Sequence, residues 1–345
     1  MNINILPPPD SSCVESKIIN PGSPYTVAVR TLGTAGKVFE AEIKSILRQT
    51  VLPYEILAYI PYGYDLPEDF EGMSAIKWIR CGKGMITQRS QDMSHIKTKY
   101  ILFLDDDVEL QPISAEMLIS EIEENDGDCI AANVFRNCDM NLKQIISCFK
   151  YLTFPHFSKK YSVIIRGSAH YSYALKPANV MLSQSAAGPC SMIKSEVFNK
   201  LEFEQERWLE DFGYPLGEDL LMFNKIYQSG GRLLISNDCG AVHLDAKTGH
   251  QKNVKEINFK QNIIWYCLWH RTQYMTAGSL PARLQKTASY YASWLWLAAI
   301  DVVSCLKSRS LWRLKNRLKS LPAAKKYIKG ERYSGIRPYI IQNLR

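Results

Sequence analysis

Segments typical of strands alternate with segments typical of helices in the first part of the chain, and this alternation restricts the fold more than any other feature. The strand-like segments are rich in β-branched and aromatic residues and comprise residues 25–30, 53–60, 76–80 and 100–104. Apolar residues at helical spacing over 39–47 and over 85–96 predict helices between them. Strands that alternate with helices predict an α/β fold whose central sheet is mostly parallel and flanked by helices.

Further elements follow along the chain. We predict a helix over 114–125, a strand over 129–135, a strand over 190–193 with a helix from Ser195, a helix between Gly217 and Gly230, and strands over 232–236 and 240–244. Residues 137–185 show weak periodicity and are expected to be irregular. Beyond about residue 250 the sequence becomes helical, rich in tryptophan and finally basic.

Three aspartates, Asp105, Asp106 and Asp107, directly follow the apolar segment 100–104. Their mutual repulsion raises the free energy of the folded state, so we expect a positively charged partner beside them. Ligands of open parallel sheets bind beyond the carboxyl ends of the strands, which is where these residues fall. Asp105 and Asp107 point the same way and suit a hard divalent cation that also binds phosphate oxygens. A solvated acidic turn is the alternative interpretation.

The composition indicates a globular protein made in a reducing compartment. Of its 345 residues, 46% are hydrophobic and 22% are charged, which allows one large domain with a smaller appendage, or two domains. The nine cysteines are odd in number and scattered, and the first residues lack the basic and apolar regions of a signal peptide. We therefore expect a cytoplasmic protein with a loose leader at residues 1–24.

Several sequence motifs stand in an order that is more specific than any one of them. They are SILRQTVLPYEI, GKGMITQRSQDMSHIKTKYILFLDDDVELQP, GPCSMIKSEVF, GEDLLMFNKIYQSGGRL and AVHLDAKTG. Together they resemble family 2 glycosyltransferases over residues 25–250, and members of that family have the Rossmann-like GT-A fold. The resemblance implies transfer of a sugar from a nucleotide-sugar donor to an acceptor, with inversion at the anomeric carbon.

The resemblance also implies roles for individual residues of a donor site. Asp105 is similar to the aspartate that faces the ribose, Asp107 to the metal-binding aspartate of the DXD motif, and Asp106 to the spacer between them. Thr31 matches a nucleotide-contacting position after the first strand, and Arg89 matches the arginine that precedes the DXD strand. For Thr31 and Arg89 the alternative is an ordinary surface position.

Further positions match residues that bind metal or carry the reaction. His243 is similar to a metal-binding histidine, and with Asp107 and two diphosphate oxygens it would hold Mg²⁺ or Mn²⁺. Asp219 is similar to the catalytic base, and Glu218 to the acid beside it. The alternatives are a structural histidine at a strand end, and acids that the helix dipole favours in a first turn whatever their function.

The sequence also departs from known patterns. Ile60 and Pro61 stand where family members commonly carry aspartates that hold the base, so the nucleotide and the sugar stay open. QNIIW at 261–265 is similar to the QxxRW motif of processive polysaccharide synthases, but Ile264 replaces the arginine, which predicts single addition. GTAGK at 33–37 is not a P-loop, because its glycines are too close together and Val38 replaces the Ser or Thr.

Positive charge is concentrated at the C-terminal end. From Lys307 onward the chain has twelve Lys or Arg and one acid, so this part has a net charge of +11. Because the net charge of the whole chain is +8, the remainder has a net charge of −3. Residues 290–306 are apolar but short of the roughly 20 residues of a membrane span, so we expect a packed or half-buried helix. A leucine stripe at 311, 314, 318 and 321 among cations predicts an interfacial helix. We expect residues 251–345 to bind an anionic membrane surface; a soluble helix packed on the catalytic domain is the alternative.

These observations predict an enzyme on the inner face of the cell membrane that adds a sugar to a glycan or lipid-linked acceptor in cell-surface polysaccharide synthesis. Two other classes stay open. A nucleotidyltransferase can share the fold and the metal site, but RTLGTAGK lacks the glycine-rich GxGTR-like loop expected after the first strand. A nucleic-acid-binding protein would use the basic tail, but the acids near the predicted site argue against a nucleic acid partner.

Overall fold

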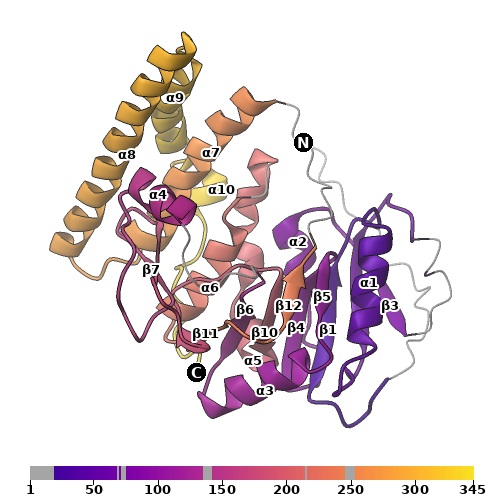
Figure 1. Cartoon of the computed structure of the whole chain (residues 1–345). Coiled ribbons are helices and arrows are strands. Elements are labelled where there is room, and N and C mark those ends of the chain that lie inside the picture. Colours follow the sequence, from indigo (N-terminus) through magenta and orange to yellow (C-terminus); the bar gives the residue numbers. More distant parts are fainter. Residues whose placement is uncertain (1–18, 68–69, 71–74, 135–141, 214–215, 245–252) are drawn as a thin grey trace.

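An eight-stranded sheet forms the centre of the computed structural model (Figure 1), which describes residues 19–67, 70, 75–134, 142–213, 216–244 and 253–345. Its strands are β1 (Tyr25–Arg30), β2 (Ile56–Pro61), β3 (Ile76–Cys81), β4 (Tyr100–Asp105), β6 (Cys129–Ala132), β9 (Val180–Leu182), β10 (Cys190–Lys194) and β11 (Leu233–Ser236). Their order is β3-β2-β1-β4-β10-β6-β11-β9, and β9 and β10 run antiparallel to their neighbours. Two small sheets pair β5 (Val108–Leu110) with β12 (Ala241–His243), and β7 (Val163–Ile165) with β8 (Tyr171–Tyr173).

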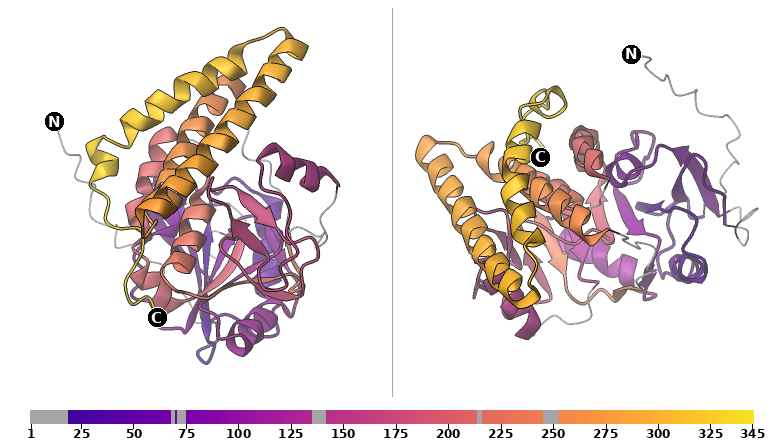
Figure 2. Two further views of the ribbon diagram at one scale, coloured as in Figure 1. Left: turned by 90° about the vertical axis from the view of Figure 1, so that its left-hand side faces the viewer. Right: turned by 90° about the horizontal axis from the view of Figure 1, so that it is seen from above.

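Helices cover both faces of the sheet, and further helices form a layer at the C-terminal end (Figures 1 and 2). The helices of the first part are α1 (Lys37–Ile46), α2 (Met85–Arg89), α3 (Ser114–Glu124), α4 (Leu142–Lys150), α5 (Ser195–Lys200), the 3₁₀ segment η2 (Phe203–Phe212) and α6 (Glu218–Gln228). Those of the second part are α7 (Val254–Trp269), the π-helical turn η3 (His270–Tyr274), α8 (Leu280–Ser308), α9 (Trp312–Tyr327) and α10 (Glu331–Ser334).

Alternate residues of the strands enter two apolar cores, one on each face of the sheet. Val27 and Val29 of β1 lie in the core that α1 and α3 close, whereas Ala28 lies in the core that α2, α5, α6 and α7 close. Strands buried on both faces read as continuous apolar runs, which is why the sequence predicted them well. The predicted α/β fold with a mostly parallel sheet is confirmed.

Two predicted segments differ from the observed structure. The helix expected over 85–96 ends at Arg89, and Asp92 Oδ1 then accepts a hydrogen bond from the Ser94 N–H at 2.9 Å, a local turn that competes with the helix. The segment 137–185 was wrongly predicted to be irregular. Residues 135–141 lie outside the described part, but the rest contains α4, β7, β8 and β9. Strands of three residues are too short to show a period, and β9 depends on pairing with the distant β11.

The C-terminal helices are attached to the rest of the fold by a cluster of buried charges. Arg271 of η3 donates from Nη2 to Glu206 Oε1 of η2 at 2.8 Å, and Lys225 Nζ of α6 lies 3.6 Å from the same oxygen. All three side chains are fully buried. An unpaired ion in such a place costs several kcal/mol, so the three elements depend on one another. The expected boundary at 250/251 falls within residues 245–252, outside the described residues, and the division into domains stays a prediction.

The leucines of the predicted interfacial stripe differ in exposure. Leu311 and Leu318 are 56% and 52% exposed, Leu321 packs against the core, and α9 also buries Arg317 and Ala324. Arg317 Nε lies 2.5 Å from Oδ2 of Asp301 on α8, so the acid that interrupts the apolar segment anchors α9. Among the described helices, α8 alone is long and apolar enough to cross a membrane, on length and composition only. The helical character of the C-terminal region is confirmed, and its membrane role stays a prediction.

Candidate active site

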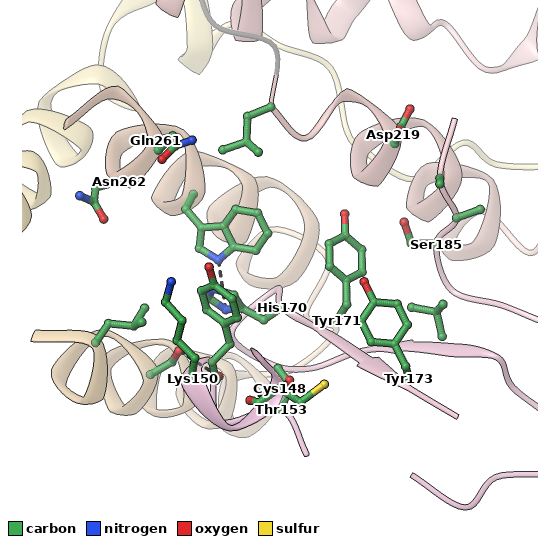
Figure 3. Close-up of a pocket in the computed structure, with 18 of the residues that line it drawn as sticks. Cys148, Lys150, Thr153, His170, Tyr171, Tyr173, Ser185, Asp219, Gln261 and Asn262 are labelled. Atoms are coloured by element: carbon green, nitrogen blue, oxygen red, sulfur yellow. Dashed lines mark hydrogen bonds between the residues drawn. The ribbon is translucent and has the colours of Figure 1, made fainter. Parts of the chain in front are cut away.

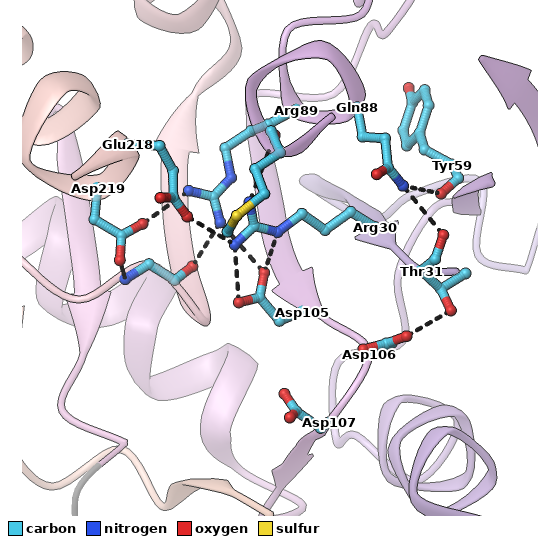
Figure 4. Close-up of polar contacts among 12 residues, drawn as sticks. Arg30, Thr31, Tyr59, Gln88, Arg89, Asp105, Asp106, Asp107, Glu218 and Asp219 are labelled. Atoms are coloured by element: carbon cyan, nitrogen blue, oxygen red, sulfur yellow. Dashed lines mark hydrogen bonds and ion pairs between the residues drawn. The ribbon is translucent and has the colours of Figure 1, made fainter. Parts of the chain in front are cut away.

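The carboxyl ends of β1 and β4 bring opposite charges together (Figure 4). In the parallel register Arg30 is the partner of Asp105. Arg30 Nε lies 2.5 Å from Asp105 Oδ1, Arg30 Nη2 donates to Oδ2 at 3.0 Å, and Arg89 Nη2 lies 3.3 Å from Oδ1. Burial raises the pKa of Asp105, but the two arginines prevail and lower it to about 2. The positive partner expected beside the aspartates therefore includes the chain's own arginines.

Asp219, in the first turn of α6, is held by Arg89 and by the backbone of Gly188 (Figure 4). Its Oδ1 lies 3.0 Å from Arg89 Nη1, and its Oδ2 accepts a hydrogen bond from the Gly188 N–H at 2.9 Å. Arg89 Nη2 also donates to the Gly188 carbonyl at 3.1 Å. A Cβ at position 188 would lie 1.9 Å from Asp219 Oδ1, so only glycine fits here without displacing the carboxylate. These contacts fix the orientation of Asp219.

Glu218 lies on the other side of the same network. Its Oε1 is 3.3 Å from Arg30 Nη2, and the residue is buried. Burial raises the pKa of Glu218, the neighbouring Asp219 adds to this, and Arg30 and Arg89 oppose it. Helix α6 starts after Gly217, whose φ of 91° glycine adopts readily. Both acids therefore fall in the first turn, where the helix dipole favours negative charge.

Thr31 and Asp106 form a second pair beyond the same strand ends (Figure 4). Thr31 Oγ1 donates to Asp106 Oδ2 at 2.6 Å and accepts a hydrogen bond from the Gly33 N–H at 2.8 Å. Burial raises the pKa of Asp106; the Thr31 hydrogen bond opposes this shift, and the neighbouring carboxylates add to it. The Asp106 side chain therefore links the loop after β1 to the turn after β4.

Asp107 and His243 form a third cluster. Pairing of β5 with β12 sets Val108 opposite His243 and places His243 Nε2 3.1 Å from Asp107 Oδ1. A carboxylate oxygen and an imidazole nitrogen that converge suit Mn²⁺ or Mg²⁺. No group of three or more His, Cys, Asp or Glu in the described part of the chain could hold a metal. The pair therefore fits a cation whose remaining ligands are phosphate oxygens and water.

Glu210 of η2 fixes the position of the short helix α2, which ends at Arg89. Its Oε1 accepts a hydrogen bond from the Thr87 N–H and its Oε2 one from the Thr87 hydroxyl, both at 2.7 Å. Gly84 precedes α2, and a Cβ there would lie 2.2 Å from Glu210 Oε1. Arg89, which contacts both Asp105 and Asp219, is thus held in place by Glu210 of η2.

A cavity of about 1100 Å³ opens beside Asp219 and is lined by residues of α4, α7, α8 and α9 and of the chain around β7 and β8 (Figure 3). Much of its wall is aromatic or amide, including Tyr151, His170, Tyr171, Tyr173, Gln261, Asn262 and Trp265. Trp265 Nε1 donates to His170 Nδ1 at 3.1 Å. Burial lowers the pKa of His170 to about 3, so its side chain is neutral near pH 7. Asp219 belongs both to this wall and to the arginine network.

The structure thus gathers the predicted site residues into three adjacent groups. Asp105, Arg89, Glu218 and Asp219 share one network, Thr31 pairs with Asp106, and Asp107 meets His243. The sequence analysis missed Arg30, whose position opposite Asp105 follows only from strand register. It quoted the segment that contains Gly188 without assigning that residue a role. Ile60 and Pro61 are buried at the end of β2, as strand residues rather than free loop positions.

Solved structures of GT-A glycosyltransferases share this fold. GalNAc-T7 with UDP, GalNAc and Mn²⁺ has a TM-score of 0.51 and 15% identity, over 81% of this chain and 57% of that chain. The mannosyltransferase PcManGT from Pyrobaculum calidifontis, in complex with GDP-Man and Mn²⁺, has a TM-score of 0.51 and 13% identity, over 90% of this chain and 82% of that chain. At such identities the likeness establishes the fold.

One segment of the sequence matches a family model. Residues 69–201, which are 133 of the 345 residues, match the model described as glycosyl transferase family 2. This confirms the resemblance drawn from the motifs. The matched segment includes Arg89 and the three aspartates, whereas Arg30, Asp219 and His243 lie outside it. No curated protein matches the chain.

Proposed function

We propose that this protein transfers a single sugar from a nucleotide-sugar donor to an acceptor hydroxyl, with inversion at the anomeric carbon. The observation that carries the proposal is the position of Asp219, which contacts Arg89 on one side and lines the cavity on the other. A carboxylate at this boundary can take the proton of a hydroxyl in the cavity while positive groups face the leaving diphosphate.

The donor would lie across the carboxyl ends of β1 and β4. Asp105 accepts hydrogen bonds from the ribose, and Thr31 and Asp106 contact the nucleotide from the adjoining loops. Arg30 and Arg89, which meet at Asp105, give this side of the site its positive charge. Asp107 and His243 would hold Mg²⁺ or Mn²⁺, which, when bound, neutralises charge on the diphosphate.

Of the two neighbouring acids, Asp219 is the better general base. Its carboxylate is oriented by the Gly188 N–H and by Arg89, and it lines the cavity where an acceptor hydroxyl could approach. Glu218 is buried against Arg30, so it acts on the donor side by positioning that arginine. One base opposite one leaving group gives a single displacement at the anomeric carbon, and a single displacement inverts it.

The cavity supports a glycan as the acceptor. Aromatic faces such as Trp265 and Tyr173 offer apolar contact area, and Gln261 and Asn262 offer amide donors and acceptors for sugar hydroxyls. Because His170 is neutral near pH 7, this part of the wall suits neutral sugar residues. Ile264 is buried in the core in place of the arginine of processive synthases, in keeping with one addition per reaction.

We place the reaction at the inner face of the cell membrane, in synthesis of a cell-surface polysaccharide on a glycan or lipid-linked acceptor. Support comes from the excess of cations after Lys307 and from the apolar helix α8. Cations near an anionic leaflet contribute on the order of 1 kcal/mol each, which would retain the protein without a spanning segment.

A thermal-shift screen of nucleoside diphosphates and sugar nucleotides with and without Mn²⁺ tests the proposal. We expect one nucleotide to stabilise the protein in Mn²⁺, by about 2.7 kcal/mol at a concentration of one hundred times its Kd. Transfer of labelled sugar from the donor so identified would then be measured directly. Preference for a nucleoside triphosphate with release of pyrophosphate would indicate a nucleotidyltransferase, and no stabilisation by any nucleotide would refute the proposal.

A further inference from the structure

Helix α8 is buried along one side and exposes apolar residues along the opposite side. Along one side Ser293, Leu297, Asp301 and Cys305 are buried at successive helical turns. On the opposite side Leu295, Val302 and Leu306 are 62%, 42% and 77% exposed. A soluble helix normally places polar residues on its exposed side, so the exposed side of α8 requires a partner from outside the fold.

Helix α4 also exposes apolar side chains along one side. Leu142, Ile146 and Phe149 recur at helical spacing and are all exposed. The segment that follows adds Phe154 and Phe157, of which Phe157 is 86% exposed. Phe149 and Phe154 contact each other edge to face, with ring centroids 5.0 Å apart, so these aromatic rings form one patch rather than scattered single residues.

The two exposed sides form one surface, which we call the α4–α8 face. Trp296 Nε1 of α8 donates to the Phe149 carbonyl of α4 at 3.1 Å, and Ser293 Oγ donates to the Tyr151 carbonyl at 3.3 Å. Both views in Figure 2 place α4 and α8 on the same side of the molecule. Apolar patches larger than a few hundred Å² mark interaction sites on soluble proteins.

The charge around this face indicates what covers it. Residues 142–160 and 280–330 contain fifteen Lys or Arg and one acid, Asp301. That acid is buried and paired with Arg317 at 2.5 Å, which leaves fourteen cations and no further acid in these two ranges. Lys150 and Lys160 adjoin the aromatic patch, and Arg309 follows the end of α8. Two copies of such a surface would repel each other, whereas an anionic bilayer would attract it.

We propose that the α4–α8 face docks in the interface of an anionic lipid bilayer, with α8 lying in the membrane plane. Transmembrane insertion of α8 would remove Asp301 from Arg317 and separate α8 from α4, so the helix inserts on one side only. Trp296, Phe149 and Phe157 are exposed on this face, and aromatic side chains of this kind are enriched at membrane–water interfaces. This surface differs from the leucine stripe of α9 that the sequence suggests.

The docking surface adjoins the proposed acceptor site. Cys148 of α4 and Ser293 and Leu297 of α8 line the cavity that contains Asp219. If the proposed function holds, the cavity of the docked protein lies beside the bilayer, where an acceptor anchored by a lipid can reach it. The binding surface itself does not depend on sugar transfer.

Co-sedimentation of the full chain with vesicles tests the proposal. The vesicles contain phosphatidylcholine alone or mixed with phosphatidylglycerol, and the variants are Leu295→Glu, Phe157→Glu, Leu318→Glu on α9 and Ile113→Glu before α3. Each variant adds one negative charge at an exposed apolar position, so the electrostatic change is matched. We expect Leu295→Glu and Phe157→Glu to weaken binding to anionic vesicles at least tenfold, and Leu318→Glu and Ile113→Glu less than threefold.

Several outcomes would overturn the proposal. One is equal vesicle binding by all four variants and the wild type, and another is loss of vesicle binding in Leu318→Glu alone. A third is a wild type that does not bind vesicles but forms a dimer in solution that Leu295→Glu dissociates. Thermal midpoints confirm that each variant is folded. Nucleotide binding in Mn²⁺ reports on the proposed function separately, because a protein that binds vesicles but no nucleotide contradicts only that function.

Discussion

Replacement of Gly188 by alanine should disable the proposed base, Asp219, by displacing its carboxylate rather than by changing the residue itself. The new Cβ would lie 1.9 Å from Asp219 Oδ1, whereas ordinary contact begins at 3.4 Å, so the carboxylate must move by about 1.5 Å. Displacements of about 1 Å in a reacting group cost roughly 10² in rate, which corresponds to about 2.7 kcal/mol of transition-state stabilisation. We therefore expect kcat of Gly188→Ala to fall about a hundredfold.

The assay separates this effect from a general loss of structure. Turnover is measured with labelled donor, and calorimetry gives the nucleotide affinity in Mn²⁺. This affinity should change less than turnover, because the new Cβ would lie 2.9 Å from Arg89 Nη1 but 1.9 Å from Asp219 Oδ1. Gly278→Ala is the matched control, because a Cβ at Gly278 meets nothing within 4 Å. In the double variant Gly188→Ala with Asp219→Asn, kcat should fall no further than in Asp219→Asn alone, because both changes act through the side chain at position 219. Turnover of Gly188→Ala within about threefold of the wild type would refute the reasoning.

Three further predictions concern other residues of the site and cavity. Asp107→Asn should weaken nucleoside diphosphate binding in Mn²⁺ and change little in EDTA; equal calorimetric affinities in saturating Mn²⁺ would contradict the metal assignment. Asp219→Asn should lower turnover by roughly 10² to 10⁴ with donor binding nearly intact, whereas Glu218→Gln should mainly weaken donor binding, because Glu218 contacts Arg30; the reverse order would exchange their roles. Burial lowers the pKa of His170 to about 3, so the unfolded chain takes up its proton near pH 6.5 and the folded chain does not. The free energy of unfolding should thus fall as the pH drops from 6.5 toward 3, by up to about 1.4 kcal/mol per pH unit, and urea titrations should show a smaller fall for His170→Asn.

The sequence was sufficient to predict a feature where the residues of a single strand or helix indicate it. Strands such as β4 are buried on both faces and therefore appear as apolar runs, and Asp105 to Asp107 follow such a run directly. Asp219 could be placed in the first turn of a helix because Gly217 marks the start of α6. The family motifs then gave each position an expected role. None of these inferences requires knowledge of which segments meet in space.

What the sequence could not supply depends on contacts between distant segments. Arg30 is an ordinary strand residue until the register sets it opposite Asp105. The importance of Gly188 appears only when Asp219 packs against its backbone. The burial of Arg317 on α9 was not predictable either, because it depends on pairing with Asp301 of α8 rather than on apolarity. The cavity likewise exists only once α7, α8 and α9 are assembled beside β8.

The buried cluster of Arg271, Glu206 and Lys225 has a consequence for protein engineering. An attempt to change acceptor preference would naturally graft α7 to α10 of one enzyme onto the sheet of another. Arg271 travels with such a graft, but Glu206 and Lys225 stay behind in η2 and α6. A recipient enzyme without a carboxylate at the position of Glu206 would leave the buried guanidinium of Arg271 unpaired, at a cost of several kcal/mol. Chimeras should therefore exchange η2 and α6 together with the C-terminal helices.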